Sequence, residues 1–222
     1  TMLALNVSKE VLDGFGQMYV KISDANLRVA DGNTNLYENI EVNAQEKEGK
    51  WVGHDRTAKQ IKKESDALYN RIAEIITTIT EKQREKDPEL KEYSQMDKGE
   101  ALDVIFFKEG SDAAAKEFLD MIQNYKMKVI QVFGSQYPEY IELVEARFYT
   151  GDQNNSIKNK DGQDTPWLNS NFEGFPLVSS LAKLSMMQND VRQTERDVLT
   201  TLMGKELKMS STVNESNYIS LL

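Results

Sequence analysis

The chain has 222 residues, of which 39% are hydrophobic, and it carries a net charge of −9. This composition is sufficient for a sizeable core in one elongated domain, and the negative charge argues against non-specific binding to nucleic acid or anionic lipid, since both need a basic surface. The absence of cysteine excludes a disulfide framework and thiolate metal sites.

The longest predicted helix comes first and covers residues 5–40. Its stripe advances by alternating steps of three and four residues, which is typical of a helix packed lengthwise against another. The stripe consists of Leu5, Ser8, Leu12, Phe15, Tyr19, Ile22, Asn26, Val29, Asn33, Leu36 and Ile40. At about 1.5 Å per residue this helix extends roughly 50 Å, so we expect a projecting rod on which the rest of the chain packs.

The apolar residues 2–7 are preceded by neither a helix cap nor the basic start of a signal peptide. We therefore expect residues 1–11 to continue a membrane-spanning helix that lies upstream. The alternative is that they only dock on the core. The given sequence has no stretch of about 18 apolar residues, so we expect no span within it.

A second helix is predicted from residue 58 to about residue 85. Its stripe is regular and consists of Ala58, Ile61, Ser65, Leu68, Ile72, Ile75 and Ile79. Gly49 and Gly53 predict a turn before it, and the short link predicts an antiparallel hairpin. Acidic residues end the first helix and basic residues open the second, so we expect them to neutralise one another across the hairpin. A basic partner-binding patch at residues 56–63 is the alternative.

The rest of the chain is also predicted to be mainly helical. The expected elements are a short helix or strand at 102–107, helices at 111–134 and 138–148, a turn-rich surface excursion at 151–174, and a last helix at 176–205. Stripes with a period near 3.5 and no clear strand alternation predict an all-α, elongated helical bundle. We assign residues 1–206 to this domain and 207–222 to a linker toward further domains.

Some polar residues interrupt the predicted stripes. Asn26 and Asn33 lie in the stripe of the first helix, and Gln188 and Glu195 lie in that of the last. A polar residue in a helix seam costs stability and fixes register or oligomeric state. The alternative is that these positions are exposed, or that the first helix breaks at residues 31–32.

The sequence gives little indication of catalysis or metal binding. His54 is the single histidine, and no partner is apparent for it in a metal site. Asp152, Asn154 and Ser156 match the first spacings of a calcium loop, but the glycine and the closing acid that such a loop needs are missing. There is no phosphate-binding loop and no nucleophile elbow. We therefore expect no enzyme activity, no metal and no cofactor.

Three motifs resemble a known family. They are the sequence from Met2 to Leu12 (MLALNVSKEVL), the sequence from Asn171 to Leu177 (NFEGFPL), and the sequence from Gln188 to Val191 (QNDV). Together they are similar to the GldM family of gliding-motility proteins, called PorM in secretion systems, and the resemblance covers essentially the whole chain. It implies the first, helical periplasmic domain of a protein anchored in the inner membrane.

The resemblance also implies a role and partners. Family members dimerise, join a GldL-like membrane partner to form an ion-driven motor for type IX secretion and gliding, and reach an outer-membrane lipoprotein complex through later domains. No nucleic acid and no small-molecule substrate is implied. The candidate dimer and membrane-proximal residues are Leu5, Leu12, Phe15, Tyr19, Ile22, Asn26 and Asn33, with Gly14 and Gly16 allowing close approach or marking a kink. A periplasmic ligand-sensing bundle, with the excursion at 151–174 covering a pocket, is the alternative.

Overall fold

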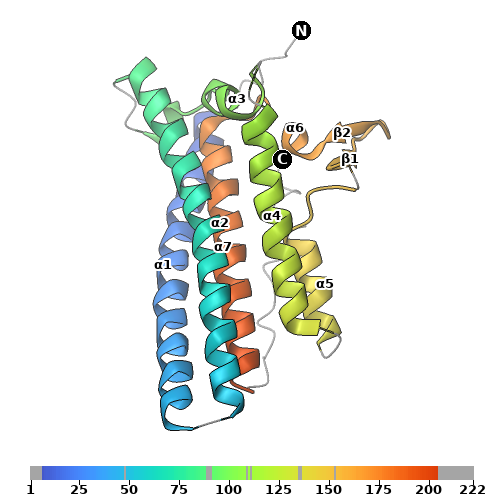
Figure 1. Cartoon of the computed structure of the whole chain (residues 1–222). Helices are drawn as coiled ribbons and strands as arrows, with labels where there is room; N and C mark the ends of the chain where they lie inside the picture. Colours follow the sequence, from blue (N-terminus) through green and yellow to red (C-terminus); the bar gives the residue numbers. More distant parts are fainter. Residues whose placement is uncertain are drawn as a thin grey trace.

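The computed structural model describes residues 7–47, 49–88, 92–108, 110, 112–134, 137–152 and 154–204. Four long helices lie along one axis (Figure 1): α1 (Lys9–Glu46), α2 (Lys50–Lys86), α4 (Asp112–Phe133) and α7 (Leu177–Leu202). The shorter elements are η1 (Tyr93–Gln95), α3 (Glu100–Phe106), α5 (Pro138–Arg147), β1 (Ser156–Lys158), β2 (Asp164–Pro166) and α6 (Trp167–Phe172). The predicted all-α, elongated bundle is confirmed.

The helix α1 begins later and ends later than predicted. Ser8 has an extended backbone and caps the helix by accepting a hydrogen bond from the Val11 amide at 3.4 Å, so the helix does not run back through residues 7 and 8. It then continues without a break through Gly32 as far as Glu46. Residues 1–6, which include Leu5, lie outside the described part of the chain.

The predicted antiparallel hairpin of α1 and α2 is confirmed, with a tighter turn than expected. Gly49 supplies the left-handed backbone of the turn, with φ of 89°, a conformation that glycine adopts without steric cost. Gly53 lies inside α2, which starts at Lys50 instead of residue 58. The turn therefore needs only the first of the two glycines, and the second is tolerated within the helix.

The core lies where α2 faces α1, α4 and α7. All seven predicted stripe residues of α2 are buried, from Ala58 to Ile79. Phe118, Ile122 and Tyr125 of α4 pack against this stripe, and α7 closes the core with a broad apolar face. None of the helices in the described ranges is long and apolar enough to cross a membrane.

The predicted irregular excursion contains more structure than expected. The strands β1 and β2 pair antiparallel, with Ile157 opposite Thr165, and α6 follows directly. The turn forms around Asn159, whose side-chain oxygen accepts hydrogen bonds from the amides of Asp161 and Gln163. Strands of three residues are too short to produce a readable alternation, which is why the sequence did not reveal them.

Candidate functional site

The helices α1 and α7 share a buried polar seam. The Asn26 side-chain amide donates a hydrogen bond to the backbone oxygen of Ser185, and the Asn33 amide donates to that of Arg192, both at 3.0 Å. In each pair the acceptor lies 159 residues further along the chain. The same contact thus recurs one heptad apart, which requires two parallel helices in one register. Asn189 strengthens the first pair by donating to the Asn26 oxygen at 2.8 Å.

A carboxylate is buried within this seam. Glu195 is only 1% exposed. It accepts hydrogen bonds from the Asn33 amide at 2.8 Å, the Tyr37 hydroxyl at 2.6 Å and the Arg192 guanidinium at 3.0 Å. Arg192 also pairs with Asp66 of α2 at 2.9 Å. We call these five residues the Glu195 cluster, and it joins α1, α2 and α7 at one height of the rod.

Burial and neighbouring charges shift the pKa values of three members of the Glu195 cluster. Burial raises the pKa of Tyr37 well above its usual range, and the adjacent Glu195 carboxylate raises it further. Burial alone would raise the pKa of Asp66, but hydrogen bonds from Lys62 and Arg192 outweigh it and lower that pKa. For Arg192, the two carboxylates likewise outweigh burial and raise the pKa. Removing Glu195 would take a buried hydrogen-bond partner from Asn33, Tyr37 and Arg192 at once.

The predicted first-helix residues face the interior of their own chain. The buried ones are Leu12, Asn26 and Asn33, and the partly buried ones are Phe15, Tyr19 and Ile22. The sequence flagged Asn26, Asn33, Gln188 and Glu195 as seam residues, and all four are buried. The surface of α1 that stays open to a second molecule is its opposite face.

The two predicted close-approach glycines differ in their surroundings. Gly16 lies beneath the Tyr93 ring of η1, and a Cβ atom at residue 16 would overlap that ring. Gly14 has nothing within 4 Å of such a Cβ apart from its chain neighbours and the adjacent backbone of its own helix. Close approach therefore occurs at Gly16, toward η1 of the same chain, and not at Gly14.

The outer face of α1 carries a second heptad pattern that was not predicted from the sequence. Val20 and Leu27 lie seven residues apart and are 42% and 62% exposed. The acids Asp24, Asp31 and Glu38 follow the same spacing, are exposed, and have no ion-pair partner among the described residues. In the sequence, Val20 and Leu27 each lie one position after a residue of the inner stripe. The acids lie four residues further on, where a heptad would have its second apolar position.

The outer face of α2 has the opposite charge near the hairpin turn. Lys59 pairs with Glu41 of α1 at 3.0 Å, in line with the expected neutralisation across the hairpin. Arg56 and Lys63, one heptad apart, are exposed and have no ion-pair partner in the described ranges. The hairpin therefore presents an acidic and a basic outer face side by side.

The second family-like motif forms a tight turn before α7. Phe172 is fully buried, and Gly174 adopts φ of 73°. The backbone oxygen of Phe175 lies so close to Gly99 that a Cβ there would overlap it. The Lys183 ammonium lies over the Phe175 ring at 5.2 Å. This motif thus fixes the position at which α7 begins in the bundle.

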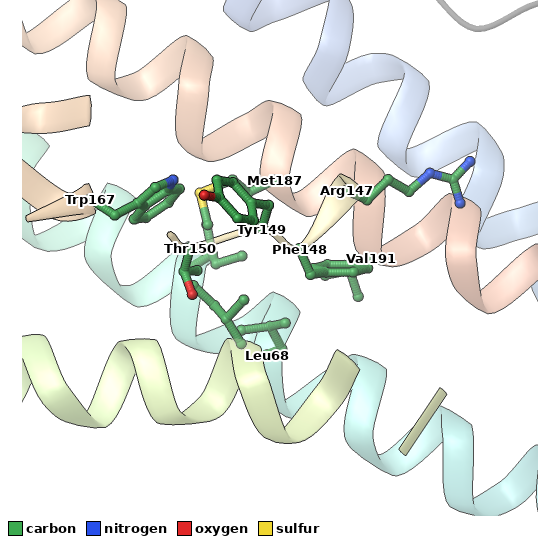
Figure 2. Close-up of a pocket in the computed structure, with 10 residues that line it drawn as sticks. Leu68, Arg147, Phe148, Tyr149, Thr150, Trp167, Met187 and Val191 are labelled. Carbon is green, nitrogen blue, oxygen red and sulfur yellow. The ribbon is translucent and has the colours of Figure 1, made fainter. Parts of the chain in front are cut away.

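The excursion covers a small cavity of about 30 Å³ (Figure 2). Trp167, Tyr149 and Met187 line one side of it, and Phe148 and Val191 line another. This volume suits about one methyl-sized group or water, far below the several hundred Å³ typical of ligand pockets. Across the described ranges, no three metal-ligating side chains come together.

The sequence profile of one family, described as the GldM N-terminal domain, matches residues 10–205. The match begins near the start of α1 and passes the end of α7, so it covers the whole described bundle. No sequence of a curated protein matches the chain. Proteins with this domain are components of gliding motility and type IX secretion, in which it is a periplasmic, structural domain of a membrane-anchored protein and not a known enzyme. The chain therefore belongs to the GldM N-terminal domain family.

Proposed function

We propose that this chain is a structural, force-transmitting periplasmic domain of an inner-membrane, ion-driven motor that powers type IX secretion and gliding. The observation that carries the proposal is the parallel α1–α7 seam. Both helices run from the end of the rod that holds α3 to the end that holds the hairpin turn (Figure 1). Motion applied at the start of α1 would be transmitted along the bundle to the far end of α7.

The seam has the chemistry of a joint that resists sliding. If α1 moved along α7, Asn26, Asn33 and Glu195 would lose their partners in a buried environment, and each buried polar group left unpaired costs about 1–3 kcal/mol. An apolar seam would lack such penalties, because it would hold no polar groups to be left unpaired. The polar pairs therefore couple the two helices along their length.

The wider assembly follows from the family resemblance. A membrane span would precede α1 and join a GldL-like partner in the inner membrane, and later domains beyond residue 206 would reach an outer-membrane lipoprotein complex. The extended Ser8, which caps α1, would then lie in a joint between the span and α1. In this arrangement, the bundle is the first rigid body above the membrane.

We further propose that two copies meet through the outer faces of their hairpins. Lys62 lies over the Tyr37 ring at 5.7 Å, so Lys63 stands at a height between Asp31 and Glu38. Acids of one copy and bases of the other would alternate if a two-fold axis ran along the rod. Two α1 helices facing each other would instead place acids against acids. Glu74, which would lie near Asp24 of the other copy, is paired with Arg71 at 3.2 Å.

The test of force transmission uses the absence of cysteine in the chain. In the full-length protein, Asn26→Leu with Asn33→Leu makes these two seam positions apolar and removes their side-chain donors. The Ser23 and Ser185 hydroxyls lie 3.0 Å apart, so Ser23→Cys with Ser185→Cys can form a disulfide across the same seam. We expect the leucine pair to reduce gliding and secretion, and the added disulfide to restore both under oxidising conditions.

The controls separate this role from a fault in folding. The leucine variant must be exported at normal levels with unchanged helical content, and each single cysteine must fail to restore function. The cysteine pair in the natural background should leave gliding unchanged. If the folded leucine variant glides and secretes like the natural protein, the seam does not transmit force.

A further inference from the structure

A polar groove lies between α4 and the segment that follows α5. Its volume is about 450 Å³, within the range of small-ligand sites. The polar side chains that line it are Asp120, Gln123, Lys126, Thr150, Asp152 and Asn155. Nothing in the force-transmitting function uses this groove, which lies on the α4 side of the bundle, away from the α1–α7 seam.

The groove offers both donors and acceptors. Gln123 and Lys126 have no hydrogen bond or ion pair with another described residue. Thr150 donates to the Asn155 side-chain oxygen at 3.0 Å, which leaves the Asn155 amide hydrogens for a ligand. Asp152 accepts a hydrogen bond from the Tyr149 hydroxyl at 3.1 Å through one oxygen and keeps the other. Donors and acceptors together suit hydroxyl groups, which donate and accept at once.

One wall of the groove is rigid before any ligand arrives. Gly151 has φ of 97°, and a Cβ there would overlap the backbone of Ser156, so only glycine fits. Asn155 also has a left-handed backbone, with φ of 50°. The backbone oxygen of Asn155 accepts a hydrogen bond from the Trp167 backbone amide at 2.7 Å. A wall fixed in this way lowers the entropy cost of binding.

Two exposed apolar side chains lie beside the polar lining. Tyr149 is 47% exposed and directly precedes Thr150. Met127 is 57% exposed and lies one helical turn from Gln123 on α4. A sugar ring presents hydroxyls at its edge and an apolar C–H face, so an aromatic side chain beside amides and carboxylates is a matching surface.

The cavity of Figure 2 adjoins the groove, because Thr150 lines both. Its walls beside Thr150 are the side chains of Tyr149, Trp167 and Met187, and they are mainly apolar. A volume of about 30 Å³ is enough for a methyl-sized group. A hydroxyl-rich ligand with a short acyl group would fill both spaces.

We propose that the groove and this cavity form a binding site for an N-acetylated amino sugar, with the sugar hydroxyls in the groove and the acetamide methyl in the cavity. The inference goes beyond the force-transmitting function and does not depend on it. A free oligosaccharide and a polymeric glycan strand of the cell envelope share this chemistry. The site would give the bundle a point of attachment to glycan.

The test compares two disaccharides that differ mainly in the acetamide groups. The 222-residue chain, labelled with ¹⁵N, is titrated with N,N′-diacetylchitobiose and, as the matched probe, with cellobiose, while amide chemical shifts are followed. We expect saturable shifts at residues 150–152, Asn155 and Gln123 with an affinity of about 1 mM, as is usual for weak, open sites. Cellobiose should bind at least about tenfold more weakly.

Two variants locate the contacts. Gln123→Ala removes groove hydrogen bonds and should weaken chitobiose binding about tenfold, whereas Gln60→Ala, on the exposed face of α2, should leave it unchanged. Val191→Ile adds a methylene to the cavity wall and should abolish the preference for the acetylated sugar without unfolding the bundle.

Every outcome of the titration decides the proposal. Equal binding of the two sugars, shifts elsewhere on the bundle, or no saturable shift with either sugar would overturn it. Once binding is established, sedimentation with insoluble glycan sacculi distinguishes the sources: co-sedimentation that chitobiose competes away identifies the polymer, and binding of the soluble disaccharide alone identifies free oligosaccharide. These titrations do not involve gliding, so their failure leaves the force-transmitting proposal standing.

Discussion

Glu195 shows how one residue holds three helices. It is fully buried and satisfied by Asn33, Tyr37 and Arg192. We expect Glu195→Ala to lower the free energy of unfolding by about 3–5 kcal/mol, because Arg192 and its hydrogen-bonding neighbours would remain buried without their acceptor. Urea denaturation followed by circular dichroism measures this change. The exposed Glu38→Ala should change stability by less than about 0.5 kcal/mol, and an equal loss in both variants would refute the argument.

Asp66 makes the stability of the folded chain depend on pH in the acid range. Its pKa is lower in the folded chain than in the unfolded one, so the folded state gains stability from ionised Asp66 above the unfolded pKa near 4. That contribution is lost as pH falls through the folded pKa. Asp66→Asn should therefore be less stable than the natural chain at pH 7, and the difference should shrink steadily below about pH 4. A constant difference from pH 7 to pH 2 would contradict the assignment.

At the scale of elements, Gly14 and Gly16 form a natural pair of experiments on α1. Gly14→Ala should stabilise the bundle by up to about 1 kcal/mol, because alanine favours a helix and the site is open. Gly16→Ala should destabilise it by about 1–3 kcal/mol, since its Cβ overlaps the Tyr93 ring near the backbone of η1 and something must move. Thermal denaturation of the two variants checks the sign of each effect. Stabilisation by Gly16→Ala would show that η1 does not pack on Gly16.

The elements that could be predicted from the sequence were those with a clear helical periodicity. The stripe from Ala58 to Ile79 identified α2, because local side chains decide which face of a helix is buried. The short strands and the helical position of Gly53 were missed, because they depend on partners elsewhere in the fold. Asn33 and Glu195 were each singled out in the sequence, but their mutual pairing was not, since no local pattern says which two stripes meet.

At the scale of the whole molecule, the charged hairpin faces predict how two copies associate. Asp31→Lys with Glu38→Lys should weaken dimerisation, as should Arg56→Glu with Lys63→Glu. All four changes together should restore it, because the charges are exchanged and not removed. Sedimentation equilibrium at low salt measures the dimer fraction, with Glu142→Lys and Glu145→Lys on α5 as the matched charge control. Failure of the fourfold variant to recover would exclude these faces.

The constant offset of 159 residues between seam partners has a consequence for the order of folding. The chain emerges from its N-terminus during synthesis and export, so α1 appears first and must wait for α7 before Asn26 and Asn33 find their acceptors. Such distant contacts form late and slowly. Until then the α1–α2 hairpin exposes an apolar flank. The nascent chain therefore depends on a chaperone, or on rapid delivery, for nearly its whole length.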